Sequence, residues 1–126
     1  MEAVLDAQVA SLLMHGNMDR VFNETDPASR LAAMDDLWTS DPVMYEPGQM
    51  LVGRNAICAN VSRLHQRLPA GTTFTPSGPV AGHHGLFILD WTAGAPGQSP
   101  HTFGTDIVLL KDGRIDRLYI LTDHVA

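Results

Sequence analysis

A β-hairpin signal near the C-terminal end constrains the fold of this chain most. Two apolar runs, Phe103–Leu110 and Ile115–Leu121, flank the sequence Lys111-Asp112-Gly113-Arg114. Asp-Gly between runs rich in β-branched residues is a strong hairpin signal, because Gly adopts positive φ without steric cost. Asp106 stands out in the first run, since burying a carboxylate costs free energy unless it is paired or its pKa shifts. We therefore expect Asp106 to have either a structural partner or a function.

The register of this hairpin decides which residues lie beside Asp106. A two-residue loop places Asp106 opposite Tyr119. A three-residue loop with Gly113 in the left-handed region shifts the pairing by one residue. Asp106 then shares a face with three residues of the second strand, Leu118, Ile120 and Thr122. The sequence leaves both registers open.

Three helical segments are expected in the first half of the chain. Residues 2–24 carry apolar side chains at helical spacing, with a break or C-cap expected at Gly16-Asn17. Residues 1–16 are therefore a candidate N-terminal helical arm. Asp26-Pro27 begins a second helix, which ends at residues 39–42 because the residue before a proline avoids the α region. A third helix is expected at residues 55–67.

The second half of the chain is expected to form strands. Val43–Glu46 is a short strand stopped by Pro47-Gly48, and residues 72–75 form a strand whose following prolines suit a sheet edge. Residues 86–91 form the next strand, and the hairpin follows. Helices first and strands after, with short connections, indicate an α+β fold with helices on one face of an antiparallel sheet. A chain of 126 residues forms a single domain, residues 1–126.

Both faces of the late strands are apolar. Leu86 and Ile88 alternate with Phe87 and Leu89, whereas a sheet with one solvated face alternates apolar and polar side chains. The second face therefore needs a cover, and few residues remain to provide it. We predict a homodimer formed through the sheet.

Charge and cysteine content exclude several classes of partner. A net charge of −6 argues against nucleic acid and anionic membrane, because both require basic patches. No apolar run approaches the ~20 residues of a membrane span, and the N-terminus lacks the basic region of a signal peptide. The single cysteine, Cys58, allows no intramolecular disulfide and fits a cytoplasmic protein.

Neither a metal nor a cofactor is expected. Six histidines are scattered without metal-ligand spacing, and the adjacent His83 and His84 would point to opposite faces of a strand. No Gly-rich phosphate loop follows a strand, and no serine lies in a nucleophile elbow.

Three carboxylates on strands are candidates for chemistry. Glu46 is either functional or a solvated strand end, and Asp90 is most simply a surface or loop-capping group. Asp106 is the hardest to explain as a structural residue. The structural partners available to it are Arg54, Arg117 and Tyr119.

The order of several short motifs resembles the nuclear transport factor 2-like superfamily, which includes ketosteroid isomerase and the SnoaL-like polyketide cyclases. The residues that carry this resemblance are Leu37–Pro47, Gly53–Ile57, Gly104–Ile107 and Asp112–Ile115, and it covers roughly residues 18 to 123. The resemblance implies a cystatin-like cone, in which a curved antiparallel sheet wraps around three N-terminal helices. It also implies an apolar pocket and a dimer.

Comparison with ketosteroid isomerase implies roles for individual residues. Glu46, before Pro47, matches the general base, and Asp106 matches the aspartic acid that donates a hydrogen bond to the developing oxyanion. Phe22 stands where that enzyme has a Tyr, so the hydroxyl is missing there, and Tyr45 and Tyr119 are the candidates to replace it. The match to Asp106 requires the register of the three-residue loop. Residues expected to line the pocket are Phe22, Trp38, Tyr45, Val61, Phe87, Trp91 and Leu118.

Two other chemistries of the superfamily fit less well. The acid/base Asp and the His of the SnoaL-like cyclases fall at Ile120 and Thr105, and the Arg of limonene epoxide hydrolase falls at Gly104. We therefore expect a small apolar ligand and an isomerase-like or cyclase-like enzyme that uses carboxylate acid/base chemistry on a carbonyl compound. The alternative is a non-catalytic ligand-binding or dimerisation module of the same fold.

Overall fold

The computed structural model describes residues 2–124. Its helices are α1 (Glu2–Asn17), a turn of π-helix (Met18–Phe22), α2 (Pro27–Leu37) and α3 (Arg54–Arg67). Its strands are β1 (Trp38–Glu46), β2 (Gln49–Val52), β3 (Thr73–Pro76), β4 (Ala81–His83), β5 (Leu86–Gly94), β6 (Thr102–Lys111) and β7 (Arg114–His124). Within this range, none of the helices is long and apolar enough to cross a membrane.

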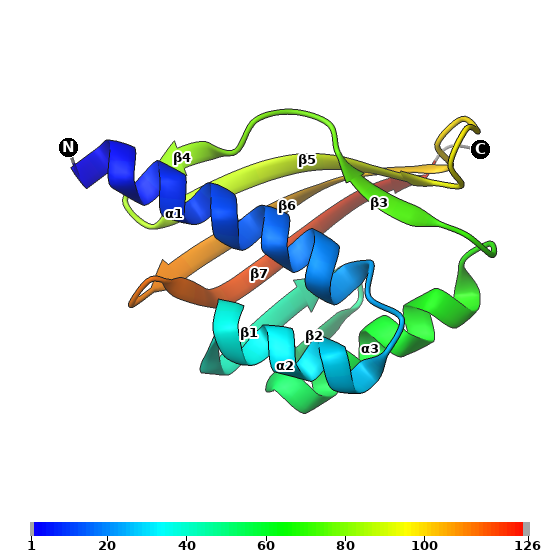
Figure 1. Ribbon diagram of the computed structural model, residues 1–126, viewed down its shortest axis with the longest axis horizontal. Coiled ribbons are helices and arrows are strands. Elements are labelled where there is room, and N and C mark those ends of the chain that lie inside the picture. Colours follow the sequence, from blue (N-terminus) through cyan, green and yellow to red (C-terminus); the bar gives the residue numbers. More distant parts are fainter. Residues whose placement is uncertain (1, 125–126) are drawn as a thin grey trace.

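The strands form one curved sheet, and the helices pack against one of its faces (Figure 1). The strand order is β2-β1-β7-β6-β5-β3, and β4 also pairs with β5. The expected α+β class is confirmed. The sheet is mixed rather than wholly antiparallel, because β1 runs parallel to β7 while the other pairs are antiparallel.

The helix break expected at Gly16-Asn17 does not occur. Asn17 keeps helical angles (φ −62°, ψ −44°), and the helix continues into the π-turn, which ends where the N–H of Asn23 donates to the carbonyl of Met18. Gly16 has a packing role instead, since a Cβ there would lie 3.2 Å from Cδ2 of Leu37. Ala10 and Met14 of α1 are buried in the common core, and Met1 lies outside the described residues.

The second helix begins as expected and ends earlier. Asp26 caps it, because its Oδ2 accepts from the N–H of Ser29 at 3.0 Å, with Pro27 in the first turn. The helix ends at Leu37, and β1 begins directly at Trp38. Residues 39–42, expected to end the helix, instead form an irregular part of β1, since pairing with β7 resumes only at Val43.

Two short strands were not expected from the sequence. Gly48, at φ +88°, turns the chain back so that β2 pairs with β1 before α3 begins. β4 pairs with the first part of β5, while β3 lies at the sheet edge as its prolines predict.

The central hairpin combines a two-residue turn with the register of the longer loop. Asp112 (φ 52°) and Gly113 (φ 73°) form the turn between the paired residues Lys111 and Arg114. The register then shifts between Leu109 and Leu110, because Asp116 is an extra residue on β7. Asp106 therefore lies opposite Ile120, not Tyr119.

The outer face of the sheet, turned away from the helices, carries many exposed apolar side chains. Residues of β5 that point inward are buried, while their neighbours on the outer face are exposed. Leu86 and Phe103 are each 44% exposed and Leu121 is 54% exposed. We call this the outer face; its other large exposed apolar residues are Met50, Val52, Ile88 and Tyr119.

Candidate functional site

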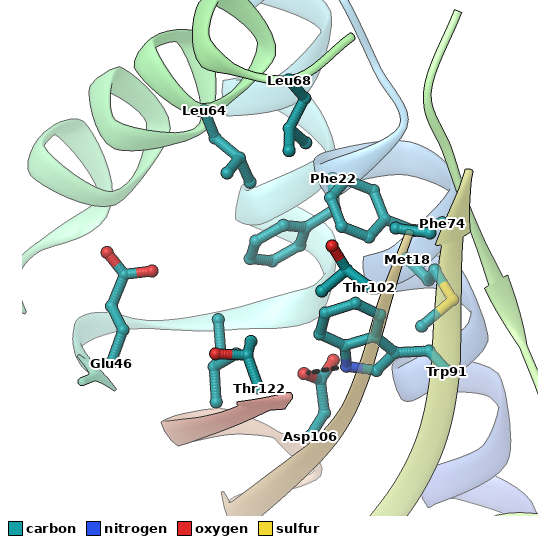
Figure 2. Close-up of a pocket in the computed structure, with 12 residues that line it drawn as sticks. Met18, Phe22, Glu46, Leu64, Leu68, Phe74, Trp91, Thr102, Asp106 and Thr122 are labelled. Carbon is teal, nitrogen blue, oxygen red and sulfur yellow. Dashed lines mark hydrogen bonds between the residues drawn. The ribbon is translucent and has the colours of Figure 1, made fainter. Parts of the chain in front are cut away.

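A cavity of about 100 Å³ lies between the inner face of the sheet and the helices. Figure 2 shows the residues that line it, with Glu46 on the opposite side from Trp91 and Asp106. Most of the lining is hydrocarbon, so the few polar groups define what it can bind. The lining residues are Met18, Phe22, Glu46, Leu64, Leu68, Phe74, Trp91, Ala93, Thr102, Asp106, Ile120 and Thr122.

Phe22 is held in the cavity wall by contacts to the backbone of the π-turn. The buried guanidinium of Arg30 donates to the carbonyl of Val21 at 3.2 Å and to that of Cys58 on α3 at 2.9 Å. Nε2 of His65 donates to the carbonyl of Phe22 at 2.6 Å. These bonds join the end of the π-turn to α2 and α3. Phe74 packs edge-on against Phe22, with ring centroids 6.1 Å apart.

Trp91 is the hydrogen-bond partner of Asp106. The indole Nε1–H donates to Oδ1 at 2.9 Å, and Asp106 as a whole residue is only 7% exposed. Gly104 makes this contact possible, because a Cβ there would lie 2.2 Å from Cζ2 of Trp91. The indole therefore lies over the backbone of β6, two residues before Asp106. Trp91 also borders a shallow hollow on the far side of Gly104.

Burial controls the protonation of Asp106. Desolvation raises its pKa from 3.8 to about 7, and the Trp91 hydrogen bond opposes part of this rise. Oδ2 of Asp106 has no hydrogen-bond partner among the described residues. A carboxyl group that retains its proton close to neutral pH can donate a hydrogen bond into the cavity.

Glu46 is anchored through one of its two carboxylate oxygens. Its Oε1 accepts from Nδ2 of Asn60 at 3.0 Å and also from Nε2 of Gln49. Asn60 is itself buried, and its Oδ1 accepts from Gln49 at 3.2 Å and from Arg63 at 3.4 Å. Oε2 has no partner among the described residues, so it is the oxygen available to accept a proton from a ligand.

Four of the nine site residues expected from the sequence meet at this cavity: Phe22, Glu46, Trp91 and Asp106. Four others lie in the packed core and do not line it. Trp38 is fully buried, and its indole donates to Oδ1 of Asn17 at 2.8 Å. The other three core residues are Val61, Phe87 and Leu118.

Tyr45, the remaining expected residue, lies on the outer face. Side chains alternate along β1, so Tyr45 points away from the cavity that its neighbour Glu46 borders. Tyr45 stacks on Tyr119, with ring centroids 4.4 Å apart. Neither tyrosine can therefore supply the hydroxyl missing at Phe22.

The expected structural partners of Asp106 are engaged elsewhere. Arg54 pairs with Asp35 and donates to the carbonyl of Trp38, and Arg117 pairs with Asp116. Asp90 is an exposed outer-face residue that accepts from Oγ1 of Thr105 at 2.6 Å, in agreement with its surface interpretation.

Several lining residues were not singled out from the sequence. Thr122 was expected on the face of Asp106 in the register of the three-residue loop, but not as a pocket residue, and Thr102 could have been found by counting along the same strand as Asp106. Met18 lies one helical turn before Phe22. The contributions of Leu64, Leu68 and Phe74 depend on how α3 and β3 pack, which no local pattern shows. No group of three or more metal-ligating side chains occurs among residues 6–123, whose side chains the structure describes.

The comparisons with known proteins agree with this architecture. A proposed isomerase of the SnoaL-like family from Agrobacterium tumefaciens str. C58 has a TM-score of 0.75 and 24% identity, over 96% of this chain and 97% of that one. A proposed ketosteroid isomerase from Kribbella flavida DSM 17836 has a TM-score of 0.70 and 15% identity, over 96% of this chain and 82% of that one. A proposed polyketide cyclase from Sinorhizobium meliloti has a TM-score of 0.65 and 22% identity, over 86% of this chain and 92% of that one. No curated protein matches the sequence.

These structural likenesses, all below 25% identity, establish the cystatin-like fold. The sequence itself matches the model of the SnoaL-like domain over residues 17–118, which include all of α2, β1 and α3 and most of the hairpin. The resemblance expected from Leu37–Pro47 and the hairpin motifs is thus confirmed. The chain belongs to the SnoaL-like domain family, within the nuclear transport factor 2-like superfamily.

Proposed function

We propose that this protein is an isomerase-type enzyme that moves a proton next to the carbonyl group of a small ligand. Glu46 abstracts the proton through Oε2, and Asp106 donates a hydrogen bond to the oxygen on which negative charge develops. The observation that carries the proposal is the presence of two differently held carboxyl groups in one cavity. Amide donors hold one of them, while burial raises the pKa of the other.

The cavity favours a compact ligand. A cavity of about 150 Å³ lined by hydrocarbon binds benzene, and the cavity here measures about 100 Å³. A monocyclic enone is therefore a better probe than a polycyclic one. The similar structures described as a proposed isomerase and a proposed ketosteroid isomerase support the reaction type through their fold.

The proposal is tested with cyclohex-3-enone, whose conversion to the conjugated cyclohex-2-enone is followed by ultraviolet absorbance. We expect Glu46→Gln, which removes the base, and Asp106→Leu, which removes the donor, each to lower the rate by about 10²-fold or more. Asp90→Asn, on the outer face, is the matched control and should retain the wild-type rate. Solvent deuterium incorporation, measured by NMR, reports proton abstraction separately. Wild-type rates in both cavity variants would refute the mechanism.

The second candidate is a non-catalytic ligand-binding module. Phe22 favours it, because the cavity wall has an aromatic ring without a hydroxyl at this position. In that case cyclohex-2-enone binds while solvent deuterium incorporation stays at the uncatalysed rate.

We further propose that the protein is a cytoplasmic homodimer formed through the outer face. Exposed apolar side chains there would be covered by a second copy. The outer face is acidic at Asp90 and Asp123 and basic at Arg117, so a two-fold arrangement would bring opposite charges together. We expect Leu121→Glu to be monomeric by sedimentation equilibrium. Leu12→Glu, on an exposed position of α1, should leave a dimer.

A further inference from the structure

A second polar group lies beside Asp106 on the inner face of the sheet. Thr122 on β7 pairs with Gly104 on β6, while Asp106 pairs with Ile120. Thr122 and Asp106 are therefore diagonal neighbours on adjacent strands, with backbones roughly 7–8 Å apart. Figure 2 shows Thr122 between Glu46 and Asp106 in the cavity wall.

The hydroxyl of Thr122 is available to a ligand. It makes no hydrogen bond to any side chain or backbone group that the structure describes. Thr102, the other hydroxyl in the cavity, lies 2.8 Å from Nδ1 of His101 and is engaged there. Gly104, opposite Thr122, has no side chain, and the indole of Trp91 lies over it, so Thr122 borders the same aromatic wall of the cavity as Asp106.

We propose that Thr122 is a second hydrogen-bond donor to the ligand oxygen, acting together with Asp106. Two donors on neighbouring strands can approach one oxygen from different directions, which is the arrangement that stabilises a developing oxyanion. The Thr122 hydroxyl would supply the hydrogen bond that a tyrosine at position 22 would otherwise donate, because Tyr45 and Tyr119 both lie on the outer face. A catalytic role of Thr122 rests on the proposed function, whereas donation of a hydrogen bond to a bound carbonyl group requires no reaction.

Thr122 differs from Asp106 in the pH range over which it can donate a hydrogen bond. Asp106 donates only while protonated, and its raised pKa of about 7 limits that donation to neutral and lower pH. A threonine hydroxyl stays a donor throughout this range. The pair therefore joins one titrating donor to one that does not titrate.

The test uses cyclohex-2-enone, whose oxygen can only accept, and cyclohexene, which has no polar group. Both are titrated by NMR at pH 6 into the wild type, Thr122→Val and Thr122→Ser. Valine keeps the shape and removes the hydroxyl, while serine keeps the hydroxyl and removes a methyl group. We expect Thr122→Val to weaken enone binding about fivefold, as for one neutral hydrogen bond, and to shift the ¹³C signal of the bound carbonyl. Thr122→Ser should stay within about twofold, the size of a small packing change.

Three results would overturn the inference: equal enone binding by the wild type and Thr122→Val, a parallel loss of cyclohexene binding in Thr122→Val, or no enone binding by the wild type. The outcome is separable from that for the proposed reaction. A loss confined to the enone, in a protein without turnover, supports Thr122 and contradicts the enzyme. Turnover that depends on Glu46 and Asp106 but not on Thr122 supports the enzyme and contradicts the role of Thr122.

Discussion

The indole of Trp91 on β5 donates a hydrogen bond of 2.9 Å to the carboxyl group of Asp106 on β6. The two residues are not direct partners in the sheet, since Trp91 pairs with Gly104 and Asp106 pairs with Leu89. The indole reaches Asp106 by lying over the glycine. This contact joins the buried acid to an aromatic wall of the cavity, opposite the wall that carries Glu46.

Replacing Trp91 should change the titration of Asp106. Trp91→Phe removes a donor that stabilises the ionised carboxylate, so the pKa of Asp106 should rise above its value of about 7. The ¹³Cγ shift of Asp106 measures this directly. Trp38→Phe is the matched control, because the Trp38 indole donates to Asn17 instead. An unchanged midpoint in Trp91→Phe, or an equal change in both variants, contradicts the assignment.

Asp106 should make the stability of the protein depend on pH. Below pH 3.8 the carboxyl group is neutral in both states, but between 3.8 and about 7 only the unfolded chain loses the proton. The free energy of unfolding therefore falls as pH rises through this window. Because each pKa unit corresponds to about 1.4 kcal/mol, the loss approaches about 4 kcal/mol.

Asp106→Asn isolates this effect, since the amide has the same shape and does not titrate. The difference in unfolding free energy between the variant and the wild type should grow in favour of the variant from pH 4 to pH 8. Urea denaturation at several pH values measures it. Parallel pH profiles for the two proteins would show that Asp106 does not titrate in this range.

Gly104 should not tolerate a side chain. In Gly104→Ala the added Cβ meets the ring of Trp91, so the indole must move or the strands must shift. We expect a loss of about 1–3 kcal/mol in the free energy of unfolding, typical of overpacking. Gly78→Ala is the control, because no atom lies within 4 Å of its added Cβ. Equal stability of the two variants would show that the indole does not occupy this space.

Asn60 should act by positioning Glu46. Asn60→Leu removes the 3.0 Å bond that fixes Oε1, so kcat for cyclohex-3-enone should fall about tenfold while KM stays within about twofold, because a reacting group that moves slightly loses its alignment. Gln66→Leu, exposed on the same helix, should have no effect. A change in KM alone would mean that Asn60 shapes the cavity rather than the base.

The hairpin illustrates what the sequence can and cannot predict. Asp112-Gly113 predicts the turn, and the turn has two residues. The register nevertheless differs from that of a regular two-residue hairpin, because Asp116 bulges from β7 and accepts a hydrogen bond from Oγ1 of Thr39 at 2.8 Å. That contact belongs to the parallel pairing of β1 with β7. A pairing between residues so far apart in the chain leaves no local signal.

The candidate site was also predictable only in part, because some of its residues carry a local signal and others are set by long-range packing. Asp106 stood out because it is a carboxylate in an apolar strand, where burial costs free energy unless the group is paired or its pKa shifts. Glu46 was singled out through its match to the general base of ketosteroid isomerase, since its position alone also suited a solvated strand end. The cavity wall was harder to predict. Val61 and Leu118 have the same apolar character as the lining residue Ile120, and only packing decides which of them faces the cavity.

The titration of Asp106 in the wild-type protein tests the central claim most directly, because the claim requires a neutral acid inside the cavity. The ¹³Cγ chemical shift, followed from pH 3 to pH 9, should give a midpoint at about 7. The carboxyl group then retains its proton where a donor is needed. A midpoint close to the ordinary value of 3.8 would mean that Asp106 is ionised at neutral pH, cannot donate to a ligand oxygen, and does not have the proposed role.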